Sequence, residues 1–195
     1  SKNEKLFCKQ LSGNNLWRNA EAAKHINNLL DEDSDKESST FHISVYSHHK
    51  NTWHPPTLWV GIGCERNTNR EFIENSLNNF LETNNLSPLS IAGFATIEIK
   101  KDEKGIIDLA KLKNLPIKFF NKEALSKITV PNPSNKVFKE IGTPSVAEAS
   151  SMLAAGKGSK LLSKKIIFKN PKDSRNFSGA VTIAISESKN QYSPS

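Results

Sequence analysis

The chain has 195 residues, a net charge of +7 and a hydrophobic content of 36%. This length can bury one good core, and no apolar run approaches the ~20 residues of a membrane span, so we expect a cytoplasmic protein without membrane contact. The two cysteines lack the spacing of a zinc site or a disulfide framework.

The basic charge does not have the pattern of a nucleic-acid-binding protein. The lysines are scattered, and no basic run is interleaved with aromatic residues. Such a surface equally suits a small ligand with several negative charges. The five histidines have no cysteine or carboxylate near them at a known ligand spacing, so we expect no metal site.

The first 55 residues predict too little structure for a core of their own. A helix is expected at 20–31 and a strand at 41–47, with an acidic, serine-rich linker between them. One helix and one strand cannot enclose a hydrophobic core. We therefore interpret residues 1–55 as a partial N-terminal extension that leans on the rest of the chain.

From residue 57 the apolar pattern becomes regular and predicts a mixed α/β sheet. Periodicity indicates strands at 57–62, 93–100 and 115–120, and helices at 69–84 and 103–113. A helix at 145–155 has Ser145 as its N-cap and Glu148 as the capping-box partner. Two further strands, at 159–169 and 178–186, flank a polar turn at 170–176 and are typical of an antiparallel hairpin.

Three groups of polar residues stand where ligand sites of α/β sheets usually form. They are Gly63, Cys64, Glu65, Arg66 and Thr68 after the first strand of this region; Thr96, Lys100 and Glu103 in or after the second; and Gly142, Thr143 and Ser145 before the 145–155 helix. Strand ends bind ligands in open α/β sheets, and the first amides of a helix attract anions. We expect the three groups to meet along one edge of the sheet, which we call the rim. Each group could also serve as a turn, a cap or a surface ion pair.

Two glycine-containing segments do not complete the motifs that they suggest. GKGSK at 156–160 follows a helix, whereas a phosphate-binding loop precedes one. GIG at 61–63 lacks the third glycine of a dinucleotide site. Cys64 could be a nucleophile, but a small buried thiol is the commoner case.

The order and spacing of several segments resemble a known family. LWVGIGCERNT, ATIEIKKDE, the FF at 119–120, VPNPS, GTPSVAEAS and AVTIAIS are similar to the C-terminal domain of CbiG and its stand-alone relative CobE, proteins of cobalamin biosynthesis. The likeness covers roughly residues 57–187. WHPPTLWVGIGCERNT resembles the cyanobacterial CbiG that is fused ahead of a precorrin methyltransferase.

This resemblance implies a fold and a division of the chain. The expected fold is an α/β three-layer sandwich with a mixed β-sheet, over residues 56–188. Residues 1–55 would be a remnant of the CbiG central region, and residues 189–195 a tail or linker. The family's full N-terminal domain is not matched, and activity is expected to need it.

The resemblance also implies a function, that of a cobalt-precorrin 5A hydrolase-like protein. Such a domain would bind an anionic tetrapyrrole and assist lactone opening with acetaldehyde release. Glu65 or Glu103 would be the general base, Arg66 and Lys100 would hold substrate carboxylates, and amides near Thr143 and Ser145 would take an anionic oxygen. No cofactor is expected, and any cobalt would be part of the substrate. The alternative is a non-catalytic tetrapyrrole carrier that serves a fused or neighbouring precorrin methyltransferase.

Overall fold

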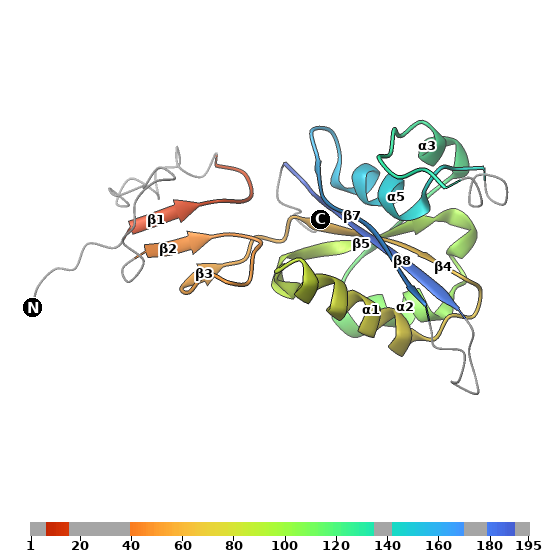
Figure 1. Ribbon diagram of the computed structural model, residues 1–195, viewed down its shortest axis with the longest axis horizontal. Coiled ribbons are helices and arrows are strands. Elements are labelled where there is room, and N and C mark those ends of the chain that lie inside the picture. Colours follow the sequence, from red (N-terminus) through yellow and green to blue (C-terminus); the bar gives the residue numbers. More distant parts are fainter. Residues whose placement is uncertain (1–6, 16–39, 135–141, 170–178, 190–195) are drawn as a thin grey trace, which may run out of the picture.

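A five-stranded mixed sheet forms the centre of the molecule (Figure 1). The computed structural model describes residues 7–15, 40–134, 142–169 and 179–189, so the predicted helix at 20–31 and turn at 170–176 lie outside the described residues. The strand order is β6 (Ile117–Phe120), β5 (Ile91–Ile97), β4 (Leu58–Cys64), β8 (Ala180–Glu187) and β7 (Lys160–Lys169). β4, β5 and β6 are parallel, whereas β8 runs antiparallel to β4 and to β7.

Helices cover both faces of this sheet, which confirms the three-layer sandwich. Figure 1 shows α1 (Arg70–Thr83) and α2 (Lys104–Lys113) on one face and α3 (Lys122–Ser126) and α5 (Val146–Ala155) on the other. Every residue of β5 is buried, as is typical of a parallel strand with helices on both sides. None of the helices in the described part of the chain combines the length and the apolar composition needed to cross a bilayer.

Several predicted boundaries were wrong, each for a local reason. The strand expected at 93–100 ends at Ile97, and Glu98–Lys100 form a 3₁₀ turn that buries Lys100. The strand expected at 41–47 is β2 (Thr40–Ile43), because beyond it Tyr46 makes only an isolated bridge to Leu86. The strand expected from residue 115 begins at Ile117, and the short helix α3 was not predicted.

A second, smaller sheet precedes the first and was predicted only in part. β1 (Phe7–Gln10), β2 and β3 (Thr52–Trp53) form three parallel strands. The chain that follows β2 joins the main core, since Val45 is fully buried there and its carbonyl accepts a hydrogen bond from Ser87 N at 2.8 Å. Gly13 N also donates to Glu187 Oε1 at 3.3 Å. The predicted boundary near residue 55 stays a prediction.

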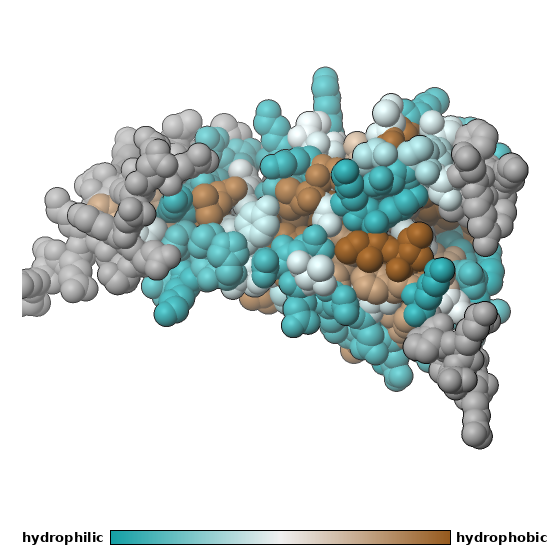
Figure 2. All heavy atoms as spheres, viewed as in Figure 1, coloured by the Kyte–Doolittle hydropathy of each residue, from teal (hydrophilic) through white to brown (hydrophobic). Residues whose placement is uncertain are grey.

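β7 forms one edge of the large sheet. Figure 2 shows hydrophobic residues at the surface in this region, bordered by hydrophilic ones. Leu162, Ile166 and Phe168 are partly buried against the core, while Ile167 is exposed. Exposed lysines at both ends of the strand are the kind of residue that discourages edge-to-edge pairing.

Helix α5 packs directly on β4 because Gly61 has no side chain. A Cβ atom at Gly61 would lie 1.9 Å from the carbonyl oxygen of Ala147. The helix is also held by Ser150 Oγ, which donates to the carbonyl of Ala95 at 3.2 Å. Both contacts require the helix backbone to touch the strands, so the position of α5 along the sheet is fixed.

The start of α5 confirms half of the predicted capping box. Ser145 Oγ accepts a hydrogen bond from Glu148 N at 3.4 Å, as expected. The Glu148 carboxylate does not complete the box. It is fully buried and accepts hydrogen bonds from Asn132 Nδ2 at 3.0 Å and from Lys165 N at 3.2 Å. It thereby ties the segment before the helix and the edge strand β7 to α5.

We expect Gly61→Ala to lower the free energy of unfolding by about 2–3 kcal/mol, because the added methyl group must displace the backbone of α5. Gly63→Ala is the matched control on the same strand, since its Cβ would meet nothing closer than 3.7 Å. Urea denaturation of both variants measures the difference. Equal stability of the two would contradict the proposed contact.

Candidate functional site

The three predicted polar groups lie at the same edge of the sheet. β4 and β5 are parallel, so their carboxyl ends meet there. The first turn of α5 reaches this edge, because a Cβ at Gly63 would lie 3.8 Å from Val146 Cβ. Val146 also packs with Ile97, the last residue of β5, in one buried cluster. The ends of β4 and β5 and the start of α5 therefore lie near one another, and a ligand site shared by the three groups stays a prediction.

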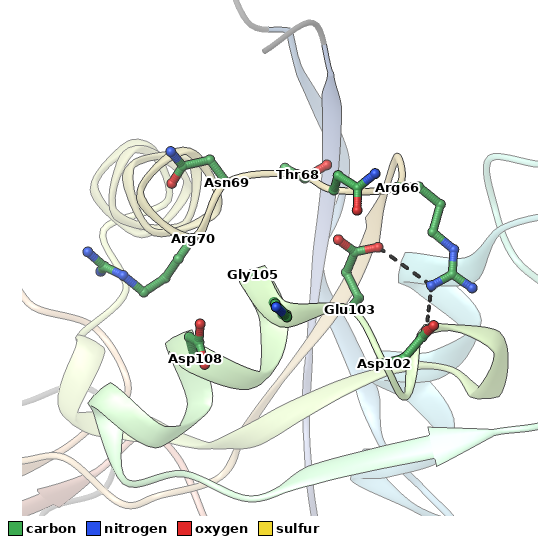
Figure 3. A pocket seen from close by; sticks show the side chains of 10 residues that line it. Arg66, Thr68, Asn69, Arg70, Asp102, Glu103, Gly105 and Asp108 are labelled. Carbon is green, nitrogen blue, oxygen red and sulfur yellow. Dashed lines mark hydrogen bonds and ion pairs between the residues drawn. The ribbon is translucent and has the colours of Figure 1, made fainter. Parts of the chain in front are cut away.

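A hollow of about 460 Å³ opens at this rim on the side of α1 and α2 (Figure 3). Its lining consists of the β4–α1 turn and the start of α2, namely Arg66, Asn67, Thr68, Asn69, Arg70, Asp102, Glu103, Lys104, Gly105 and Asp108. Both helices begin here, so their first amides and partial positive charges lie at the hollow. Gly142, Thr143 and Ser145 are not among its lining residues.

Gly105 brings the two helix starts together. A Cβ there would lie 2.2 Å from the carbonyl oxygen of Thr68. Farther along, Glu74 of α1 binds Lys113 of α2 at 2.6 Å. Sequence analysis found neither contact, because each depends on two helices packing side by side. Together they fix the shape of the hollow.

Arg66 projects from the β4–α1 turn toward the turn that precedes α2 (Figure 3). Its Nη1 lies 2.5 Å from Asp102 Oδ1 and 3.9 Å from Glu103 Oε2, and its Nη2 donates to the carbonyl of Ile99 at 2.5 Å. The hydrogen bond from Arg66 holds the pKa of Asp102 below its ordinary value. The side chains of Arg66 and Asp102 are 52% and 76% exposed, so water reaches this pair.

Lys100 and Glu103 form a second ion pair, which is buried. Lys100 Nζ donates to Glu103 Oε2 at 3.1 Å, and only 6% and 3% of these residues are exposed. Buried charges need such a partner because water no longer solvates them. The predicted carboxylate-binding lysine thus already holds a carboxylate of its own chain.

Burial raises the pKa of the Cys64 thiol to about 11. The positive charge of Lys100 acts in the opposite direction but is the smaller effect. The thiol is therefore protonated at neutral pH, and a protonated thiol is a poor nucleophile. This arrangement favours the interpretation of Cys64 as a small, partly buried residue over that of a nucleophile.

Three other predicted site residues, Thr96, Thr68 and Glu65, differ in how far they are buried. Thr96 is fully buried, and its hydroxyl donates to the carbonyl of Ile62 at 2.7 Å. Thr68 donates in the same way to the carbonyl of Glu65, at 2.7 Å, and closes the turn. The side chain of Glu65 itself is exposed. Of these three, Glu65 is the one that a dissolved ligand reaches most easily.

The segment before α5 contains a glycine turn and an unusual threonine. Gly142 has a φ of +75°, and a Cβ there would meet Lys122 Cε of α3 at 2.1 Å. Lys122 therefore lies beside this segment, a neighbour that sequence analysis missed because α3 was not predicted. The hydroxyl of Thr143 is buried and has no hydrogen-bond partner among the described residues.

The four histidines in the described part of the chain lie in or next to the small sheet, at positions 42, 48, 49 and 54. The rings of His42 and His49 stack with centroids 4.5 Å apart, and His48 lies 4.0 Å from His49. Within the described ranges, no three histidine, cysteine or acidic side chains are arranged to hold a metal ion. The expected lack of a cofactor stays a prediction.

Comparison with known proteins gives matches over the domain that carries the rim. Residues 58–186 match the family described as cobalamin synthesis G C-terminus. The cobalt-precorrin-5A hydrolase of Priestia megaterium is 33% identical over 113 residues, which are 58% of this chain and 30% of that protein. That of Salmonella typhimurium is 34% identical over 100 residues, 51% of this chain and 28% of that protein. The chain thus spans about a third of these relatives.

A solved structure agrees with the sequence matches. The crystal structure of CobE, a protein from the cobalamin biosynthetic pathway, superposes with a TM-score of 0.56 at 29% identity. The match covers 67% of this chain and 89% of that one. The same fold therefore makes up nearly all of a separate protein.

We expect Cys64 to react slowly with iodoacetamide in the folded protein at pH 8, because its pKa of about 11 leaves little thiolate. Urea-unfolded protein is the control, and peptide mass spectrometry separates Cys64 from Cys8. Labelling in the folded state should rise steeply toward pH 11. Equal rates for folded and unfolded protein at pH 8 would contradict the raised pKa.

Proposed function

The chain belongs to the cobalamin synthesis G C-terminus family, and on this premise we propose that it binds an anionic precorrin at the rim formed by β4, β5 and α5. Its role would be that of the C-terminal domain of a cobalt-precorrin 5A hydrolase. The matched segments cover only 30% and 28% of the curated relatives with this activity, so the complete reaction is part of the proposal.

The observation that carries this proposal is the position of Arg66. Precorrins carry several acetate and propionate groups, and a guanidinium can bind a carboxylate through two N–H donors at once. Arg66 is half-exposed over a hollow at which two helices begin. Arg70 lines the same hollow, but it is 32% exposed and pairs with the less exposed Glu74, whereas Arg66 is 52% exposed and its partner is open to water. Arg66 is therefore the arginine best placed to receive a substrate carboxylate.

The buried pair of Lys100 and Glu103 has a different role in this proposal. Its atoms are shielded from water, and separating them would leave an unpaired charge in the interior. The pair holds the turn after β5 in the shape that places Ile99 and Asp102 opposite Arg66. Because Glu103 balances its charge and it does not line the hollow, Lys100 has a structural role in this proposal and does not hold a substrate carboxylate.

Glu65 is the better candidate for the general base. It stands on the exposed turn after β4, whereas Glu103 is buried and already accepts a hydrogen bond from Lys100. In lactone opening, Glu65 would take a proton from water while the water oxygen adds to the lactone carbonyl carbon. The ring C–O bond then breaks, the leaving oxygen takes the proton held by Glu65 and becomes a hydroxyl group, and the carbonyl carbon ends as a carboxylate. The amides near Thr143 and Ser145 were expected to take the anionic oxygen, but both residues are buried and neither lines the hollow.

We expect Arg66→Ala to weaken binding of uroporphyrin I, an octacarboxylate tetrapyrrole, about tenfold, because a charge-assisted contact is lost. The matched control is Lys101→Ala, which removes the same charge from a nearby residue that pairs with Glu98 and does not line the hollow. Fluorescence titration at low salt measures both. Equal losses in the two variants would contradict a specific contact at Arg66.

Glu65→Gln should lower acetaldehyde release from cobalt-precorrin 5A about a hundredfold, since general-base catalysis is worth at least this factor. Glu82→Gln, at the other end of α1, is the control and should retain activity. Unchanged acetaldehyde release by Glu65→Gln would contradict the assignment of Glu65 as the general base. Tight binding without any acetaldehyde release by the unaltered chain would favour a carrier role.

A further inference from the structure

Asp102 occupies the position at Arg66 that a ligand carboxylate would need. Its Oδ1 accepts a direct, charge-assisted hydrogen bond from Arg66 Nη1. Figure 3 shows the two side chains facing each other at one end of the hollow. A bound carboxylate that uses Nη1 must therefore displace Asp102 or lie beside it and be repelled.

The two carboxylates near Arg66 differ in how far they depend on it. Glu103 is buried and has Lys100 at 3.1 Å, so its charge is balanced without Arg66, which lies 3.9 Å away. Asp102 is exposed, and Arg66 is the largest cause of its lowered pKa. Exposed pairs contribute little to stability because water and salt screen them. Asp102 can therefore exchange with a ligand carboxylate, whereas Glu103 stays in place.

Arg66 would keep its position if its hydrogen bond to Asp102 were broken. Its Nη2 donates to the carbonyl of Ile99 at 2.5 Å, a backbone group fixed by the 3₁₀ turn after β5. This bond holds the guanidinium over the hollow independently of any carboxylate. An arginine that stays oriented needs less ordering when a ligand arrives.

We propose that Asp102 is an internal competitor that determines how strongly Arg66 binds a ligand carboxylate. This inference rests on the proposed function, because it takes Arg66 as the residue that receives the precorrin. In the free protein Asp102 neutralises Arg66 and holds its N–H donor. A ligand carboxylate replaces it, so binding at this position is an exchange of anions and is weaker than Arg66 alone would allow.

A positioning role for Asp102 predicts the opposite change in ligand affinity. If Asp102 positioned Arg66 for the ligand, its removal would weaken binding. As a competitor, its removal should strengthen binding. Asp108 offers a matched control because it lines the same hollow, and no ion pair joins it to Arg66 among the described residues. Figure 3 shows it on the far side of Gly105 from Arg66.

The test compares Asp102→Asn with Asp108→Asn in the full chain, with uroporphyrin I as the probe. We expect Asp102→Asn to bind about two- to fivefold more tightly, the effect of removing one screened, exposed charge pair. Asp108→Asn should change affinity by less than about twofold, because it removes a charge that does not compete for Arg66. Thermal melting confirms that both variants fold.

A double-mutant cycle separates competition from a general change in charge. In an Arg66→Ala background, Asp102→Asn should no longer increase the affinity for uroporphyrin I, because there is no guanidinium for Asp102 to occupy. Weaker binding by Asp102→Asn, or equal gains from the two aspartate variants, would overturn the inference. If the unaltered chain and Arg66→Ala bind the probe equally, the proposed function fails. If Arg66→Ala binds the probe more weakly as expected but Asp102→Asn does not bind it more tightly, the inference about Asp102 is wrong and the proposed function stands.

Discussion

The close contact between α5 and β4 determines where the polar groups of the rim lie. Gly61 leaves the space that Ala147 occupies, so the helix backbone touches the strand. Ser150 and Glu148 then fix the helix by hydrogen bonds to β5, to Asn132 and to β7. With the helix at this position, its first turn stands where β4 and β5 end. A helix displaced by one turn would put its N-terminus about 5 Å from the strand ends.

Burial divides the charges of the rim into a fixed pair and an exchangeable pair. Lys100 and Glu103 face each other out of reach of water, which makes their separation costly. Arg66 and Asp102 face each other in water, which makes their separation easy. The fixed pair shapes the turn, and the exchangeable pair faces the hollow. The turn after β5 is thus held rigid by the buried pair, while Arg66 beside it can exchange one carboxylate partner for another.

Membership of the cobalamin synthesis G C-terminus family gives this arrangement a chemical context. The proposed ligand, a precorrin, carries several carboxylates, and the hollow offers one half-exposed arginine, Arg66, and two helix starts. A single exposed arginine binds a single carboxylate weakly, so contacts with several substituents would have to add together. The similarity to CobE shows that this domain fold also forms most of a separate protein.

In the described part of residues 57–187, the sequence by itself determined the types and order of the five strands of the large sheet and of α1, α2 and α5, because apolar periodicity depends on local chain geometry; it missed α3. It also placed Ser145 as a helix cap and grouped the polar residues at strand ends, and the motifs identified the family. It could not say that Lys100 turns inward, since the alternation at 94–100 looks the same for a strand as for a strand followed by a 3₁₀ turn.

Only the tertiary structure decided which charged groups meet. Arg66 and Asp102 are 36 residues apart, and Glu148 binds groups at Asn132 and Lys165 on different segments. Whether a charge is buried, like Glu103, or exposed, like Glu65, depends on what the rest of the chain packs against it. Pairing and burial are properties of the assembled layers, and no local pattern of residues encodes them.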